Sequence, residues 1–250
     1  MAGFKAALTN EIEKLYKKKK VLVATIISLI FIVIGQLAIS GMRSGLGLRG
    51  TSNMEFPILV LSVVVNTILP LFTALVTIDC FSAEFAQNTM KITLTRPVTR
   101  LKFFAAKITA IMVFIIVNLL FVMVFSLVAG IIFNSNSFTL VALIKIFICY
   151  IVTLIPMMIL AMMIVLFTNF IRSGVGVFFL SIFVFIILKV IGVIFSQYSG
   201  VLFTSMLDWY NLWIMSTFPF GKILRQFILM CSYGILFFTG SYYLFDKKDF

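Results

Sequence analysis

The sequence predicts an all-α integral membrane protein with six transmembrane helices, an N-terminal amphipathic helix and re-entrant outer helices between spans five and six. Of its 250 residues, 62% are hydrophobic and 11% are charged, whereas soluble domains average about 45–50% and about 25%. A soluble fold of this size leaves too much surface in water to hide so much apolar area. The apolar residues also form continuous runs, which favours helices over the alternating strands of a barrel.

Six runs are long and apolar enough to cross a hydrocarbon core of about 30 Å, which needs about 20 helical residues. We predict spans at residues 21–39, 58–78, 108–133, 146–167, 175–195 and 227–245. The first run is interpreted as a retained span because its apolar stretch is longer than that of a signal peptide. We expect residues 1–250 to form one transmembrane domain.

The distribution of Lys and Arg predicts the orientation. The chain has 20 basic and 8 acidic residues. With a cytoplasmic N-terminus, fourteen basic residues fall on the cytoplasmic side, and the outer side receives Arg43, Arg49, Lys222 and Arg225. Cytoplasmic loops carry such an excess, so we expect both termini in the cytoplasm. The net charge of +12 then reflects topology and anionic lipid, and no nucleic-acid partner is expected.

Composition excludes several catalytic chemistries. The chain has no His, which removes His-based triads and His-ligated metals. Its three cysteines form no CxxC pair, so neither a disulfide framework nor a zinc site is predicted. The sequence has no GxxxxGK[ST] phosphate loop, and no acidic pair lies in a span, as ion-coupled transporters usually require. We therefore expect the chain not to be an enzyme, and a transporter of this kind would need a separate source of energy.

Residues 4–16 have the spacing of an amphipathic helix. One helical face is predicted to contain Phe4, Leu8, Ile12 and Leu15, because residues three and four apart are neighbours on a helix. We interpret this segment as a helix that lies along the inner membrane surface and turns into the first span at residues 17–20. The alternative is a frayed basic leader.

The longest cytoplasmic connection, residues 79–107, mixes charged and apolar side chains. A solvated loop would not need Phe81 and Phe85. Asn88 tolerates a left-handed turn and Pro97 prevents one straight helix, so we predict two short helical pieces joined at a corner. A segment that is half apolar and rich in Arg fits a docking surface for a cytoplasmic partner. An interfacial helix that binds only lipid is the alternative.

Residues 196–221 form an unusual outer segment. They are too apolar for an exposed loop, yet Asp208 and Asn211 interrupt them, so they are unsuited to span the bilayer. Trp209 and Trp213 suit the level of the lipid headgroups. We therefore predict an interfacial or re-entrant pair of helices on the outer face.

Polar residues inside the spans are candidates for function. Lys189 falls in the outer third of the fifth span, where a lysine can snorkel to the interface, and a substrate contact is the alternative. The second span contains Asn66, Thr67 and Pro70. A polar, kinked helix either lines a pathway or packs against another helix. Together with Lys189, these three residues form the candidate pathway, and Pro156 predicts a packing kink in the fourth span.

The chain resembles the permease subunits of bacterial type-2 ATP-binding-cassette (ABC) exporters. Its layout is similar to their six spans preceded by an elbow helix, here residues 4–16. The local resemblance runs from Asp79-Cys80-Phe81-Ser82-Ala83-Glu84 through Asn88-Thr89-Met90-Lys91 to Arg96-Pro97-Val98-Thr99-Arg100. This stretch is similar to the family's coupling segment, with Asn88 where glycine is usual. The resemblance implies that the ATPase is contacted by Phe81, Glu84, Phe85, Asn88, Thr89, Leu94, Arg96, Pro97 and Arg100.

The resemblance also implies the partners. It implies a dimer of identical or sister permeases above two cytoplasmic P-loop ATPase subunits, in the cytoplasmic membrane of a bacterium. ATP and Mg would bind to the ATPase, and no cofactor to this chain. The substrate would be apolar or amphipathic, with an antimicrobial peptide or antibiotic favoured. An ATP-independent channel or secondary transporter, and a membrane scaffold or sensor that transports nothing, are the alternatives.

Overall fold

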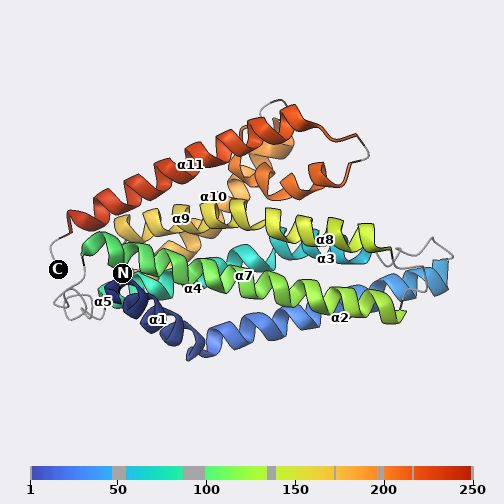
Figure 1. The fold of residues 1–250 in the computed structure, drawn as a ribbon, viewed down its shortest axis with the longest axis horizontal. Helices are drawn as coiled ribbons and strands as arrows, with labels where there is room; N and C mark the ends of the chain where they lie inside the picture. The colour runs from blue at the N-terminus through green and yellow to red at the C-terminus, as the bar shows by residue number, and fades with distance from the viewer. Residues whose placement is uncertain are drawn as a thin grey trace.

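The computed structural model is an elongated bundle whose helices run roughly along one long axis (Figure 1). It describes residues 2–46, 55–86, 99–133, 139–171, 173–195, 197, 200–215 and 217–248. All regular elements within these ranges are helical, which confirms the all-α prediction. They are α1 (Ala2–Tyr16), α2 (Lys19–Leu46), α3 (Glu55–Asn66), α4 (Ile68–Cys80), α5 (Ser82–Ala86), α7 (Arg100–Phe133), α8 (Leu140–Val152), α9 (Leu154–Phe170), α10 (Gly174–Ile194), the 3₁₀ helix η2 (Phe203–Trp213) and α11 (Phe220–Asp246).

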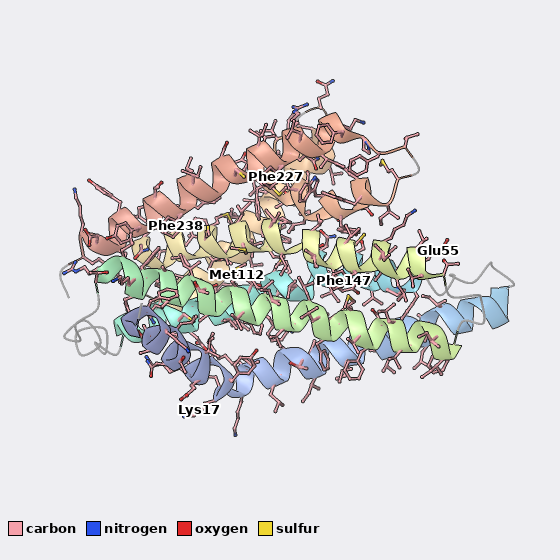
Figure 2. All side chains as sticks on the ribbon, in the orientation of Figure 1. Lys17, Glu55, Met112, Phe147, Phe227 and Phe238 are labelled. Carbon is pink, nitrogen blue, oxygen red and sulfur yellow. The ribbon has the colours of Figure 1, made fainter. Side chains whose placement is uncertain are left out.

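Five stretches are long and apolar enough to cross a membrane, and they lie in α2, α7, α8 with α9, α10 and α11. A sixth is obtained if α3 and α4, which are bent by 44°, form one broken span. These stretches fall on the six runs predicted from the sequence. The chain is therefore a multi-pass membrane protein. Figure 2 shows Met112 and Phe147 in the middle part of the bundle, with Lys17 and Glu55 towards its opposite ends.

Two helices break four residues before a proline. Pro70 and Pro156 have no N–H to bond the carbonyl of the residue four positions earlier, which weakens the helix there. Accordingly α3 ends at Asn66 and α8 ends at Val152. A neighbouring hydroxyl bonds the preceding turn at each break: Thr67 Oγ1 donates to Val63 O at 2.6 Å, and Thr153 Oγ1 donates to Cys149 O at 2.7 Å. The 44° bend confirms the predicted kink at Pro70, whereas near Pro156 the helix is interrupted at Thr153 and α8 with α9 forms one candidate span.

The long helix α7 lies at the centre of the packing. It contacts α1 and α2 on one side and α3, α4 and α9 on the other, and α11 packs mainly on α9 (Figure 1). Its 34 residues make it about 50 Å long at 1.5 Å per residue. Because α7 extends beyond the predicted span at residues 108–133, it begins beside α1 and α5, near both termini in Figure 1.

A buried tyrosine hydroxyl joins α3, α7 and α8 at the other end of the bundle. Tyr150 Oη donates to Pro57 O at 2.9 Å and lies 3.2 Å from Ser126 Oγ. Tyr150 is fully buried. Buried polar groups need such partners, since water is absent from the apolar interior.

Removal of this hydroxyl is expected to have a small but measurable effect. Tyr150→Phe should lower the free energy of unfolding by about 1 kcal/mol, the usual contribution of a hydrogen bond between membrane helices. The thermal unfolding of the purified chain in detergent, followed by tryptophan fluorescence, measures the change. Tyr16→Phe is the matched control because Tyr16 is exposed. Equal unfolding temperatures for the two variants would contradict a role for this bond.

The predicted pair of helices in residues 196–221 is not confirmed. Within its described residues this outer segment forms the 3₁₀ helix η2, Phe203–Trp213. η2 packs against α8, α10 and α11. Its buried face contains Met206 and Trp209, so this face covers the ends of the neighbouring helices, and Asp208 on the same element is left partly exposed.

Candidate functional site

A cluster of four charged side chains joins α1, α5 and α7. Lys107 Nζ, on α7, lies 2.8 Å from Glu11 Oε2 of α1 and 2.8 Å from Glu84 Oε2 of α5. It also donates to Cys80 O at 2.8 Å. The side chain of Lys107 is 0% exposed and that of Glu11 is 2% exposed. The ammonium thus donates to Glu11 and to the Cys80 carbonyl and forms an ion pair with Glu84, so its buried charge is compensated.

Lys14 completes the cluster from the solvent side. Its Nζ atom lies 3.1 Å from Glu11 Oε1 and 3.0 Å from Glu84 Oε1. Burial alone would lower the pKa of Lys14, but the carboxylates of Glu11 and Glu84 outweigh it and raise the pKa above its ordinary value. The cluster therefore contains two ammonium groups and two carboxylates, so its charges balance.

Aromatic rings form the apolar wall of this charge cluster. Lys107 Nζ lies 4.8 Å from the centroid of the Phe103 ring and 5.7 Å from that of Phe81. A cation over a ring face gains about 0.5–2 kcal/mol, most where water is excluded. Phe81 also contacts Phe104 and Phe245 edge-on, with centroids 5.7 and 6.5 Å away. The charge cluster thus lies directly against an aromatic core.

A second set of ion pairs fixes the start of α2. Lys20 Nζ lies 2.8 Å from Asp79 Oδ1, and Lys18 Nζ lies 3.7 Å from Asp79 Oδ2. Lys18 also donates to the backbone oxygen of Asp79 at 3.3 Å. The lysine run that the sequence assigns to the membrane surface therefore also holds the corner between α1 and α2 against the end of α4.

The predicted coupling segment is described only at its two ends. Glu84 belongs to the charge cluster, and Phe81 is buried, so Phe81 supports the segment from inside and is not an exposed contact. Arg100 donates to the backbone oxygens of Asp246 and Lys248 at the end of α11, where a cation also complements the helix dipole. Outside the described part of the chain lie Asn88, Thr89, Leu94, Arg96, Pro97 and the side chain of Phe85.

The N-terminal segment is a helix, as predicted, but protein covers part of its apolar face. Leu15 is buried, and Leu8 and Ile12 pack against the core, while Phe4 is half-buried. α1 makes its main contacts with α7. Glu11 lies on this same face, a position that the sequence analysis missed. An acidic residue on an apolar face needs a cationic partner. The position of Glu11 on this face therefore indicated a buried ion pair.

The candidate pathway residues form a second polar group at the bend between α3 and α4. Lys189 of α10 donates to Asn66 Oδ1, and its Nζ lies 3.5 Å from Asp208 Oδ2 of η2. Asn66 Nδ2 donates to Asp208 Oδ1 at 2.9 Å. Lys189 therefore has polar partners on α3 and η2, with 32% of its side chain exposed, and its snorkelling to the interface stays a prediction. The prediction treated its helix alone and missed Asp208, nineteen residues further along the chain.

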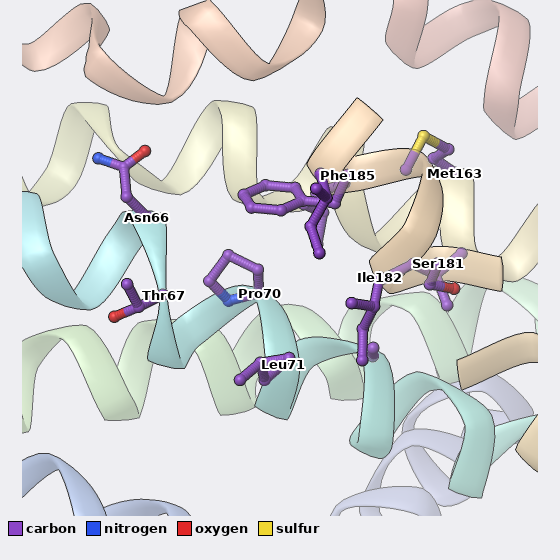
Figure 3. A pocket seen from close by; sticks show the side chains of 12 residues that line it. Asn66, Thr67, Pro70, Leu71, Met163, Ser181, Ile182 and Phe185 are labelled. Carbon is purple, nitrogen blue, oxygen red and sulfur yellow. The ribbon is translucent and has the colours of Figure 1, made fainter. Parts of the chain in front are cut away.

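An apolar pocket of about 190 Å³ opens beside this polar group, between α4, α9 and α10 (Figure 3). Asn66 and Pro70, at the bend, both line this pocket. Figure 3 shows Pro70 and Leu71 on one side and Ile182 and Phe185 on the other. Thr67 also lines the pocket, although its hydroxyl is bonded to the backbone.

Apolar helices, an ion-paired end and a polar bend define a multi-pass helical membrane protein with buried charges. A family model described as "ABC-2 family transporter protein" matches residues 7–191, from α1 into α10. The chain therefore belongs to the ABC-2 family of transporter proteins. This family supplies the membrane subunit of an ABC transporter, which works with a partner ATPase subunit. No curated protein matches the chain.

Proposed function

We propose that this chain couples ATP hydrolysis by a separate cytoplasmic ATPase to the export of an apolar or amphipathic substrate, with a peptide or antibiotic favoured. Residues 81–104 would dock on the ATPase. The observation that carries the proposal is the charge cluster of Lys107, Glu11, Glu84 and Lys14. It bonds the beginning of the predicted docking segment to two other helices.

The cluster offers a mechanical route from that segment into the membrane. Charge-assisted hydrogen bonds are shorter and stronger than neutral ones. Lys14 bonds both Glu11 and Glu84, and Lys107 forms ion pairs with the same two carboxylates. A displacement of α5 would therefore move α1 and the first turns of α7 with it. Because α7 contacts most of the other helices, this movement would reach the interior of the bundle.

The proposal includes a second permease subunit, identical or sister, and two ATPase subunits that bind ATP and Mg. It places the complex in the cytoplasmic membrane of a bacterium with both chain termini in the cytoplasm. The basic residues support this orientation, since Lys14, Lys17, Lys18 and Lys20 lie at the end of the bundle that holds α5 and positive charge marks the cytoplasmic side.

Co-purification tests the proposal. The tagged chain is coexpressed with the candidate partner, a P-loop ATPase, and the recovered ATPase is measured. Arg96→Glu, within the predicted docking segment, is expected to reduce recovery at least about tenfold, because reversal of a charge at a docking surface costs more than 1.4 kcal/mol. Lys17→Glu is the matched control, since Lys17 is 81% exposed at the same end but outside the segment.

Three results would contradict the proposal. Equal recovery with Arg96→Glu and Lys17→Glu would remove the docking assignment. Substrate transport by the chain in liposomes without the ATPase would favour the channel or secondary-transporter alternative. An intact complex whose ATPase activity responds to no peptide, antibiotic or lipid in a panel, and which transports none of them, would favour the scaffold or sensor.

A further inference from the structure

The apolar pocket and the polar group at the α3–α4 bend form one continuous site. Ile182, Phe185 and Ile186 of α10 line the pocket. Lys189 follows at the spacing that keeps residues on one helical face. Asn66 belongs to both parts, because it lines the pocket and accepts a hydrogen bond from Lys189. A molecule in the pocket would therefore meet a charged group at one end.

The ammonium of Lys189 has remaining capacity to bind an anion. It has three N–H groups, and its contacts are Asn66 Oδ1 and, at 3.5 Å, Asp208 Oδ2. The second distance exceeds the usual limit of about 3.2 Å for a good N–H···O bond. The side chain of Lys189 is 32% exposed. A carboxylate, sulfate or phosphate group could approach it more closely than Asp208 does.

The surroundings favour an anion over a cation. The same end of the bundle contains Lys145 near the start of α8 and Lys222 and Arg225 in the first turns of α11. The acidic residues described at this end are Glu55 and Asp208. Such an excess of cations attracts anions and repels cationic ligands.

The size and mouth of the pocket suit one apolar chain that comes from the bilayer. Its volume of about 190 Å³ is below the roughly 300–1,000 Å³ of pockets that enclose a drug-sized ligand. Leu71 and Ile186 line it and are 40% and 53% exposed, so the pocket opens sideways between α4 and α10. A bulky ligand would be excluded, and a single alkyl chain can enter.

We propose that this site binds an anionic amphiphile with a single alkyl chain, with the chain in the pocket and the anionic group on Lys189 in place of Asp208. Asn66 holds the ammonium towards the pocket while the carboxylate is displaced. The inference rests on the proposed function in that it names a substrate class for the same exporter.

Photolabelling of the complete chain in phosphatidylcholine nanodiscs tests the site. The probe is dodecyl phosphate with a diazirine on its alkyl chain, and dodecyltrimethylammonium with the same diazirine is the cationic counterpart. Mass spectrometry then locates the labelled residues. We expect the phosphate probe to label the lining of α4 and α10, around Leu71 and Ile186, at least about fivefold more than the cationic probe does.

Two substitutions give effects of opposite sign. Asp208→Asn removes the competing carboxylate, so labelling by the phosphate probe should rise about two- to fivefold, the range for loss of a partly exposed ion pair. Lys189→Met should abolish the labelling, whereas Lys189→Arg should retain it. Lys145→Met removes an exposed cation that does not line the pocket, so it is the matched control and should change the labelling far less than Lys189→Met does.

Other outcomes would overturn the site. A fall in labelling with Asp208→Asn, or a preference for the cationic probe, would exclude an anion-binding role for Lys189. Equal labelling of the pocket and of exposed positions on other helices, such as Val117, would show contact with bulk lipid only. The experiment contains neither ATP nor ATPase, so its failure is distinct from a failure of the co-purification.

Discussion

Lys107→Met is expected to lower the free energy of unfolding by about 3–5 kcal/mol, the cost of removing one partner from a buried ion pair. The substitution leaves the carboxylates of Glu11 and Glu84 in the interior with Lys14 as the remaining cation. It also removes the donor to Cys80 O. Thermal unfolding of the purified chain in detergent should show the loss as a large drop in the unfolding temperature.

Two further variants make this expectation specific. Lys17→Met removes an exposed lysine whose Nζ lies 3.8 Å from Glu13, and exposed pairs contribute only about 0.2–1 kcal/mol. The double variant Glu11→Gln with Lys107→Met restores the balance of charge, so it should be more stable than Lys107→Met alone. A Lys107→Met chain as stable as Lys17→Met, or a purely additive double variant, would show that the cluster does not act as a unit.

Lys107→Met also bears on the proposed coupling. If the cluster transmits movement, Lys107→Arg, which keeps the charge, should retain more substrate-stimulated ATPase activity in the complex than Lys107→Met does. A guanidinium is larger and planar, so it will not reproduce all three contacts. The comparison requires equal recovery of the ATPase with both variants, which separates coupling from docking.

The sequence predicts most of the fold because the strongest signals are local. Continuous apolar runs locate the spans, and the missing N–H groups of Pro70 and Pro156 predict breaks near Asn66 and Val152. The 3₁₀ helix η2 was not predicted. Apolar content and interruptions at Asp208 and Asn211 indicate a short irregular helix, but they do not distinguish a 3₁₀ helix from two α-helical pieces.

The charge cluster could not be predicted because its partners are distant in the sequence. Lys107 is 96 residues from Glu11, and in the sequence nothing distinguishes it from the other lysines that flank the spans. Its burial results from the packing of α1 on α7, which no local pattern specifies. Glu11 was the detectable residue, since it interrupts an otherwise apolar face. The same limitation explains why the pairing of Lys189 was not predicted, since its partner Asp208 belongs to another element.

Phe104→Ala is expected to destabilise the chain by about 3–5 kcal/mol, the usual cost of removing a buried phenylalanine. The Phe104 ring is fully buried and lies 5.3–5.7 Å, centroid to centroid, from Phe81, Phe238, Tyr242 and Phe245. Three of these rings belong to α11. Thermal unfolding in detergent measures the loss, and Phe133→Ala on the same helix is the matched control because Phe133 is exposed.

The loss should also be concentrated at one end of α11. Few residues of this helix are buried, so beyond its contacts with α9 its C-terminal end depends on the Phe104 ring and on Arg100. In Phe104→Ala, amide hydrogen exchange should therefore accelerate in residues 238–246 more than in residues 220–230, because local opening follows local contacts. Uniform acceleration along α11 would mean that Phe104 stabilises the whole bundle, and that the end of α11 is not separately anchored beside the coupling segment.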